Sequence, residues 1–407
     1  MRFLILKSKA ICYNSTYYFA DCLADSFQKL GHEAVIFEMQ GKSLAELREI
    51  TREHFDAIFD FNSKVPQGVD DEEGTYFLDA FDAPFFNYIL DHPLYQHDNL
   101  KERLQNYHVI CLDYDHADYI RRYYPHIRSV LVLPIGAMPL NDEPVKPFSE
   151  RQYHLLFTGT YTKPEEVLDI IDNCEPGLAH DMHKMIDVLK SDFSLRCDEV
   201  LELLLQKNGV VLPPPTFAQY MQLYFLVDTY ITAYVRDMVL RALAGNGIPV
   251  DIFGHGWEKF DCAEKNVFHF HGSCTFDETF SKMADAQAVL NVMPWFKNGA
   301  HDRIFSALKN GALAITDESG YLTGHFPEDT GVLTYSLKDM DDFIKKIQDF
   351  RRNPASYESL AAAGRIFVCE HDTWLKRAEE IISAVRNLSA PSGKKSGHGT
   401  SQAKLQQ

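Results

Sequence analysis

Residues 153–161 read Tyr153-His154-Leu155-Leu156-Phe157-Thr158-Gly159-Thr160-Tyr161, a mostly apolar run that gives way at once to small polar residues. A continuous apolar run of this length is expected for a strand of a parallel sheet whose two faces are covered by helices. The segment therefore predicts a buried strand that ends in a loop open to a ligand, as in a doubly wound α/β domain.

Similar apolar runs form two successive series along the chain. The first series consists of Phe3–Leu6, Ala34–Phe37, Ala57–Phe61, Phe85–Ile89, Val109–Leu112 and Val130–Leu133. The second series begins at Tyr153 and continues with Val250–Phe253, Val267–His271, Ala288–Val292, Ala312–Thr316 and Val332–Tyr335. We therefore expect an α/β protein of two Rossmann-like, doubly wound domains that face each other across a cleft.

The connection between the two series is rich in proline and charge, with prolines at 134, 139, 144 and 147. Such a segment is typical of a joint between domains. The expected domains are residues 1–140 and 152–372, the second with a leucine-rich helical insertion over about 164–244 that three prolines interrupt. A terminal helix is expected over 373–388. Residues 389–407, rich in Gly, Ser, Lys and Gln, are expected to be disordered.

The composition disfavours several kinds of partner. The chain has 407 residues, of which 58 are acidic and 40 are basic, for a formal net charge of −18. A surface this negative repels phosphate backbones and anionic lipid headgroups, so we expect no nucleic-acid partner and no membrane association. Eight scattered cysteines without a CxxC pair favour free thiols in a reducing compartment. No signal-like start and no long apolar run occur, which favours a cytoplasmic protein.

The richest polar stretch lies between residues 291 and 305, where a predicted strand is followed by a loop and a helix. The free amides at a helix N-terminus and its positive dipole end suit a phosphate group. Arg303 in the first helical turn opposes that dipole, and is better explained if it shares an anion with the amides than as an ordinary surface arginine. The candidate phosphate-binding residues here are Asn298, Gly299, His301, Asp302 and Arg303.

Two further loops follow strands of the second series and could approach the same ligand. Glycine lets the backbone come close, hydroxyls donate hydrogen bonds, and lysine supplies a point charge. Ordinary turn chemistry is the alternative explanation for both loops. The candidates are Gly159, Thr160, Tyr161, Lys163, Gly254, His271 and Gly272.

In the first domain, one predicted strand ends in Leu90-Asp91-His92-Pro93. An acid–imidazole pair at this position can act in acid–base catalysis, with Asp91 either holding the ring of His92 in place or itself approaching the acceptor. We therefore take His92 and Asp91 as the candidate catalytic residues. A partly buried histidine with a purely structural role is the alternative.

The triplet Asp113-Tyr114-Asp115 resembles the DxD motif by which another class of glycosyltransferases holds a metal ion. Chance alone gives roughly 8 acidic-x-acidic triplets in a chain of this composition, so the motif is weak evidence. We expect Asp115 to cap a helix over His116–Tyr124 instead. The histidines at 269 and 271 lack partners at metal-ligand spacing, so no metal site is expected.

One stretch resembles a known family. It runs from Asn298-Gly299-Ala300-His301-Asp302-Arg303 through Asn310-Gly311-Ala312 to Thr316-Asp317, and it is similar to the carboxy-terminal motif of the spore-maturation CgeB-like glycosyltransferases, a group with the GT-B fold. The order of Phe270-His271-Gly272 before it and Glu370-His371-Asp372-Thr373-Trp374 after it fits the same group. The resemblance covers mainly residues 250–388.

The resemblance implies a sugar transferase whose nucleoside-diphosphate sugar is held mostly by the second domain. The first domain would hold the acceptor, which could be a glycan, a protein or a small molecule, and no cofactor besides the donor is implied. Arg303 would lie on the phosphate side of the donor, and His92 would contact the donor sugar. Many retaining relatives hold the ribose with a glutamate where this chain has Ser306, which leaves the ribose contact and the stereochemical outcome open.

Catalysis would require the stabilisation of a departing diphosphate. Arg303, Lys163 and helix amides would offset that charge without a metal ion. Two alternatives remain at this stage, a nucleotide-sugar epimerase of the same architecture and a non-catalytic nucleotide- or sugar-binding module. An NAD enzyme is not expected, because no G-x-G-x-x-G follows a predicted strand.

Overall fold

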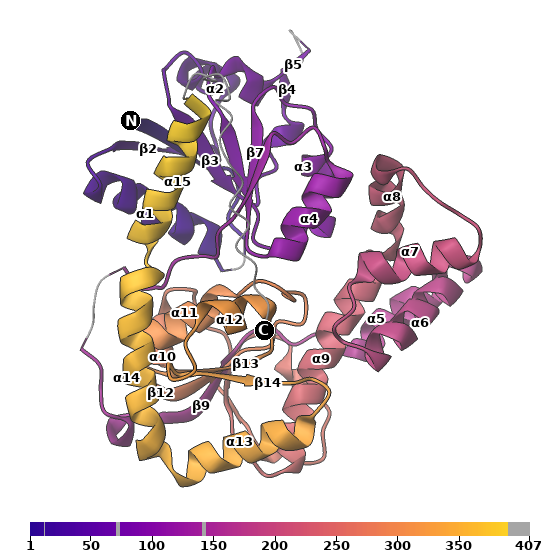
Figure 1. Cartoon of the computed structure of the whole chain (residues 1–407), viewed down its shortest axis with the longest axis vertical. Helices are drawn as coiled ribbons and strands as arrows, with labels where there is room; N and C mark the ends of the chain where they lie inside the picture. The colour runs from indigo at the N-terminus through magenta and orange to yellow at the C-terminus, as the bar shows by residue number, and fades with distance from the viewer. Residues whose placement is uncertain (12, 71–73, 141–143, 390–407) are drawn as a thin grey trace, which may run out of the picture.

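The structure is a computed structural model that describes all residues except 12, 71–73, 141–143 and 390–407, and its core is two six-stranded sheets (Figure 1). The first sheet has the order β2-β1-β3-β6-β7-β8, with β1 Arg2–Lys7, β2 Glu33–Glu38, β3 Ala57–Phe61, β6 Phe85–Tyr88, β7 Tyr107–Cys111 and β8 Ser129–Val132. The second has the order β11-β10-β9-β12-β13-β14, with β9 Tyr153–Thr158, β10 Asp251–Phe253, β11 His269–Phe270, β12 Ala286–Leu290, β13 Leu313–Asp317 and β14 Val332–Tyr335.

Every neighbouring pair in both sheets is parallel. The strands β1 and β9 lie inside their sheets, and their mostly apolar sequences suit strands that helices cover on both faces. Phe3 to Leu6 of β1 are fully buried. In the register of the first sheet, Phe3 lies opposite both Ala34 and Ala57. The prediction of two doubly wound α/β domains is confirmed.

Helices flank both sheets. Those of the first part of the chain are α1 Ser15–Lys29, α2 Leu44–Ile50, α3 His97–Leu100 and α4 Tyr114–Tyr123, with a small hairpin of β4 Val69–Asp70 and β5 Thr75–Tyr76. Those around the second sheet are α10 Glu278–Ala284, α11 Asp302–Lys309, α12 Gly320–His325, α13 Met340–Arg352, α14 Pro354–His371 and α15 Trp374–Ser389. Short 3-10 helices are η1 Val65–Gln67, η2 Phe77–Ala80, η3 Pro93–Gln96, η4 Phe148–Glu150, η5 Gln222–Tyr224, η6 Trp257–Lys259 and η7 Lys265–Val267.

Two sequence-based element assignments differ from the structure. The strand expected over Val267–His271 is limited to the two residues of β11, because η7 turns the chain just before it and Gly272 just after it has a φ of 75°. The helix cap expected at Asp115 is wrong, since α4 begins at Tyr114 and its N-cap is Asp113. The disorder expected for the tail concerns residues 390–407, which lie outside the described residues.

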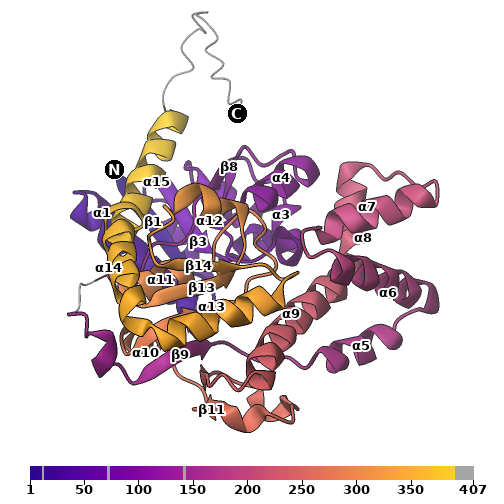
Figure 2. The same cartoon turned by 60° about the horizontal axis from the view of Figure 1, so that its bottom comes forward.

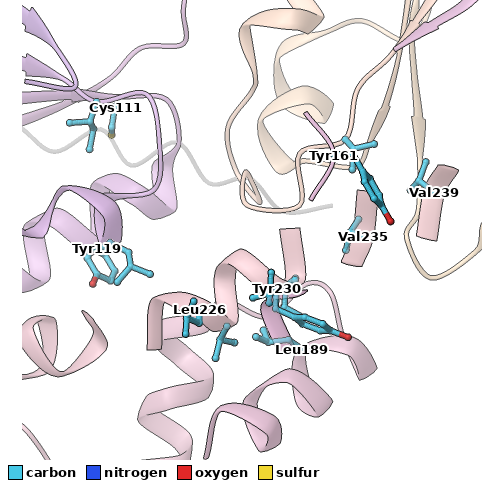
Figure 3. Close-up of a cluster of buried hydrophobic side chains, with 14 of the residues drawn as sticks. Cys111, Tyr119, Tyr161, Leu189, Leu226, Tyr230, Val235 and Val239 are labelled. Carbon is cyan, nitrogen blue, oxygen red and sulfur yellow. The ribbon is translucent and has the colours of Figure 1, made fainter. Parts of the chain in front are cut away.

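The segment between β9 and β10 forms five helices: α5 Pro164–Asp172, α6 Pro176–Ser191, α7 Cys197–Lys207, α8 Pro214–Met221 and α9 Phe225–Gly245. Both views show this helical insertion standing to one side of the sheets, with α8 close to α4 of the first domain (Figures 1 and 2). The ring of Phe217 stacks on Tyr123 with centroids 5.0 Å apart. Buried side chains including Tyr119, Leu226 and Tyr161 belong to one apolar cluster that joins the first domain, the insertion and the second domain (Figure 3).

The chain crosses back to the first domain at its carboxy-terminal end, where α15 packs beside α1 (Figure 1). Trp374 at its start is fully buried, and its ring lies 5.9 Å from that of Phe19. A side chain at Gly136 would meet the Trp374 backbone nitrogen at 2.6 Å, so this crossing requires glycine. Arg377 donates to the Pro134 carbonyl at 2.7 Å and to Asp372 at 2.6 Å, which holds the two crossing segments together.

Within the described part of the chain, no helix combines the length and the apolar character needed to cross a membrane.

Candidate functional site

A cavity of about 330 Å³ lies between the two domains, at the carboxyl ends of the strands of both sheets. Its wall from the first domain includes Asn62 after β3, Asp91 after β6 and Leu112 after β7. Its wall from the second domain includes the segment after β9 and the start of α11. Open α/β sheets bind ligands at this edge, so we take this cleft cavity as the candidate site.

Arg303 reaches the cleft cavity from the first turn of α11. His301 caps this helix, its Nδ1 accepting from the Arg303 backbone amide at 3.2 Å. The Arg303 guanidinium donates to Thr158 Oγ1 at 3.1 Å and to Asn291 Oδ1 at 2.7 Å, two groups at strand ends. These neutral partners orient the side chain without neutralising it. Burial lowers the pKa of Arg303 from its ordinary value, because the charged form loses hydration.

Arg236 on α9 lies beside Arg303, and the sequence did not single it out. The two guanidinium carbons are 6.0 Å and 5.9 Å from the centroid of the same Phe157 ring. Arg236 donates to the Thr160 carbonyl, and its buried Nε has no hydrogen-bond partner among the described residues. Burial, and then the nearby charge of Arg303, lower its pKa to about 10. The available signal was a cation, next to Asp237, inside the mostly apolar run of residues 231–240.

Two glycines bring the loops after β9 and β10 into direct contact at the wall of the cleft cavity. A side chain at Gly254, whose φ is 152°, would lie 2.0 Å from the Gly159 carbonyl oxygen. Trp257 Nε1 donates to that same oxygen at 2.8 Å. Glycine at 254 is therefore required for the contact between the two loops, since any larger residue would separate them.

Of the twelve residues predicted to bind phosphate or nucleotide, six line the cleft cavity: Gly159, Thr160, Gly254, His301, Asp302 and Arg303. The same Nδ1 of His301 lies 2.7 Å from an oxygen of the Asp302 carboxylate. The other six, which do not line it, are Tyr161, Lys163, His271, Gly272, Asn298 and Gly299.

The residues outside the cavity have other contacts. Tyr161 is buried and donates to Asp237 at 2.6 Å, and Lys163 is the residue that precedes α5. His271 stacks on Phe253 and lies 2.8 Å from an oxygen of Asp251. The carbonyl of Gly272 accepts from the Gly254 amide at 2.8 Å, so it supports the cavity wall from behind.

Asn298 and Gly299 form a junction between the domains with Asp113. The Asp113 carboxylate accepts from the amides of Asp115 and His116 in α4 and, at 2.8 Å, from the amide of Asn298. A side chain at Gly299 would meet the Leu112 carbonyl at 2.4 Å, so the close approach requires glycine. The oxygens of Asp113 are thus occupied by backbone donors, and Asp115 pairs with Arg196 at 3.4 Å. Among the described residues, no group of three or more potential metal ligands is found.

Asp91 and His92 do not form the pair that the sequence suggested. Asp91 lines the cleft cavity with an exposed side chain and accepts from Asn62 Nδ2 at 2.8 Å. His92 points away, with Nδ1 accepting from the Leu94 amide at 3.0 Å. The two side chains thus have separate partners, Asn62 for Asp91 and the Leu94 amide for His92, and no hydrogen bond between described residues joins them. The expected role of Asp91 in orienting the His92 ring is therefore wrong.

Tyr13, also not anticipated from the sequence, lies at the mouth of the cleft cavity. It has a φ of 58°, and its ring stacks on His255 of the second domain with centroids 5.5 Å apart. Its hydroxyl lies 3.4 Å from Thr160 Oγ1. The loop before α1 therefore contacts the opposite domain directly.

Comparisons with known proteins agree with this architecture. Residues 236–383 match a protein family described as glycosyl transferase-like. An alpha-glucosyltransferase in complex with UDP is 12% identical, with a TM-score of 0.58 over 95% of this chain and 100% of its own. Sucrose-phosphate synthase from Thermosynechococcus elongatus is 11% identical, with a TM-score of 0.52 over 96% of this chain and 99% of its own. HepE from Anabaena in complex with UDP and glucose is 8% identical, with a TM-score of 0.50 over 95% and 100%.

No curated protein sequence matches the chain. The structural similarities show a GT-B fold, and residues 236–383, which lie mostly in the second domain, are similar to the glycosyl transferase-like family. The match is to the broad family, and the closer resemblance to the CgeB-like group stays a prediction.

Proposed function

We propose that the chain transfers a sugar from a nucleoside-diphosphate sugar to a hydroxyl group of an acceptor, and that Arg236 and Arg303 bind the diphosphate. The observation that carries the proposal is this pair of cations in the cleft cavity. No ion pair between described residues joins either guanidinium to a carboxylate, and the nearby Asp302 carboxylate only partly opposes the lowering of the Arg303 pKa by burial. Two neighbouring desolvated cations are unfavourable alone and become favourable when an anion lies between them.

The other groups at this wall suit the same ligand. The N-terminus of α11 adds its positive dipole end, and Gly159 and Gly254 line the same cavity. As the bond between the sugar and the diphosphate breaks, negative charge grows on the leaving group. Fixed guanidinium groups stabilise that charge without reorganisation, which is the requirement for electrostatic catalysis. The arginines therefore take the role that a metal ion has in other transferases, and we propose a metal-independent reaction without a further cofactor.

On the opposite wall, Asp91 is our candidate to contact the acceptor. Its carboxylate lines the cleft cavity, is exposed there, and is held by Asn62. A carboxylate within hydrogen-bond reach of an acceptor hydroxyl can take up its proton as a general base. In the proposed reaction the acceptor oxygen bonds to the anomeric carbon, the bond to the diphosphate breaks, and the acceptor proton moves to Asp91 or to the leaving phosphate.

Two of the similar structures were solved with UDP, which makes UDP the first nucleotide to test. The net charge of −18 disfavours a nucleic-acid acceptor, so we propose a glycan, a protein or a small molecule in the cytoplasm.

The test is a thermal-shift and calorimetric screen of nucleoside diphosphates, followed by incubation of the matching nucleotide sugars with an acceptor panel. Release of the diphosphate together with a glycosylated product supports the proposal. Conversion of the donor into an isomer without any acceptor would instead establish an epimerase. Tight nucleotide binding without turnover on any acceptor would establish a binding module.

A further inference from the structure

The first domain forms one wall of the cleft cavity, and that wall is apolar except around one carboxylate. Among its described residues, Asp91 is the charged member of this wall. Both arginines of the cavity, and the neighbouring His301 and Asp302, come from the opposite wall. The acceptor side of the cavity therefore differs in chemistry from the donor side. Its members with purely hydrocarbon side chains are Ile11, Phe19, Leu90, Leu112 and Ile135.

Three of these apolar residues follow neighbouring strands and gather on the side of the wall that holds Asp91. The strands β6, β7 and β8 are adjacent and parallel, so their carboxyl ends lie side by side. Leu90 and Asp91 come after β6, Leu112 after β7 and Ile135 after β8. Leu112 and Ile135 are buried, whereas Leu90 is half-buried and keeps apolar surface in the cavity. An acceptor whose hydroxyl lies at Asp91 therefore meets hydrocarbon beside that hydroxyl.

The neutral polar side chains of this wall are engaged within the first domain. Ser15 and Thr16 are buried, and their hydroxyls donate to backbone carbonyls of the loop after β1 at 3.3 Å and 2.9 Å. Asn62 accepts from the Leu90 amide at 2.8 Å and donates to Asp91 at 2.8 Å. A sugar carries hydroxyls around its whole ring, and each one that binding takes from water needs a new partner. With these side chains already bonded, the wall suits an apolar skeleton better than a sugar ring.

Aromatic rings of the second domain lie across the same space. Trp295 and Phe276 are half-buried members of the cavity lining. Phe276 also meets Phe19 of α1 edge to face, with ring centroids 5.3 Å apart, so this contact crosses from one domain to the other. Flat rings pack favourably against such aromatic and aliphatic surface. The volume of about 330 Å³ is that of a pocket for a small molecule, and much of it is needed for the donor.

We propose that the acceptor is a small, uncharged aromatic alcohol, such as a phenol, whose ring packs against Leu90 and whose hydroxyl lies at Asp91. The inference rests on the proposed transferase function and names its acceptor class. The phenolic oxygen bonds to the anomeric carbon as the bond to the diphosphate breaks, and the phenolic proton passes to the Asp91 carboxylate. An anionic acceptor is disfavoured, because the one charge on this wall is itself negative.

Three variants separate the polarity of the wall from its shape. Leu90→Asn replaces the hydrocarbon beside Asp91 with an amide, whereas Leu90→Met keeps an apolar side chain of similar volume. Both retain the bond from the backbone amide of residue 90 to Asn62. Leu212→Asn is the matched control, because Leu212 is also half-buried, lies in the loop before α8 and does not line the cleft cavity. Thermal unfolding verifies that each variant is folded.

The probes are two uncharged phenols, methyl 4-hydroxybenzoate and 4-methylumbelliferone, together with the anion 4-hydroxybenzoate and the sugar methyl glucoside. Their binding to the full chain with saturating UDP is measured by saturation-transfer NMR below neutral pH, where the phenols stay protonated. We expect at least one phenol to bind wild type, Leu90→Met and Leu212→Asn, and to bind about tenfold more weakly to Leu90→Asn, which loses apolar contact. The acid and the glucoside should bind wild type more weakly than that phenol. The Kd of UDP should stay unchanged in every variant.

Phenol binding that is equal in wild type and Leu90→Asn would overturn the assignment, and so would an equal loss in Leu90→Met and Leu90→Asn. The comparison of probes on wild type needs no variant to fold. Tighter binding of methyl glucoside or of 4-hydroxybenzoate than of both uncharged phenols would overturn the acceptor class, as would failure of both phenols to bind a protein that binds UDP. Failure of wild type to bind any nucleoside diphosphate would instead refute the donor proposal beneath it.

Discussion

Replacement of Arg236 by methionine should weaken UDP binding while leaving the unliganded protein as stable as wild type or more so. Methionine keeps much of the apolar stem and removes only the charged group. A hydrogen bond to a charged group contributes about 1.5–3 kcal/mol, so the Kd of UDP should rise roughly 10- to 150-fold, measured by isothermal titration calorimetry.

The expected stability has the opposite sign because Arg236 is unfavourable without a ligand. Burial and Arg303 lower its pKa from 12.5 to about 10. This shift means that the charged guanidinium destabilises the folded protein by roughly 3 kcal/mol at most. The lost bond to the Thr160 carbonyl counts about 1 kcal/mol against that gain. The free energy of unfolding in urea should therefore be unchanged or higher by roughly 1–2 kcal/mol.

Arg241→Met on the same helix is the matched control. Arg241 pairs with Asp237 at 2.5 Å and lies outside the cleft cavity, so this variant should bind UDP normally and lose stability. Unchanged UDP affinity in Arg236→Met would refute the assignment of the diphosphate to the arginine pair. A large loss of stability in the unliganded variant would show that Arg236 is a structural residue.

Three further outcomes are expected. Asp113→Ala removes the cap of α4 and the partner of the Asn298 amide, so the free energy of unfolding in urea should fall by roughly 2–4 kcal/mol. A fall below about 1 kcal/mol would contradict a stabilising role of Asp113 between the domains. Burial raises the pKa of Asp60 from its ordinary value of 3.8 to about 6 in the folded state. Between these pH values the folded protein therefore binds more protons than the unfolded chain, so the free energy of unfolding should fall as pH rises from about 4 to 6. Asp60→Asn should reduce that fall in the unfolding free energy by roughly 3 kcal/mol. The remaining fall comes from Asp317, because burial raises the pKa of this carboxyl to about 6 as well. An unchanged pH profile of the unfolding free energy in Asp60→Asn would count against the raised pKa of Asp60. The Kd of UDP should be the same in EDTA as in magnesium, since the arginines carry the charge, and a strict need for a divalent cation would contradict this.

The sequence alone determined the two sheets and the edge at which the site lies. Continuous apolar runs such as Phe3–Leu6 and Leu155–Phe157 specify strands that are buried on both faces, and the polar residues after them then meet at one edge of each sheet. The same local logic placed Arg303 in the first turn of a helix at that edge. These inferences succeed because strand burial and helix starts depend on residues close together in the chain.

The tertiary structure decided which side chains share a space. Arg236 lies far from Arg303 in the chain, and only the return of α9 toward β9 brings the two guanidinium groups over one Phe157 ring. No local pattern encodes that juxtaposition. The separate contacts of Asp91 and His92 also escaped local reasoning, because the chain bends at Asp91 after β6 and the two side chains bond to Asn62 and to the Leu94 amide. Asp91 lines the cleft cavity, while His92 lines a small pocket whose other wall comes from the helical insertion, more than a hundred residues later in the sequence.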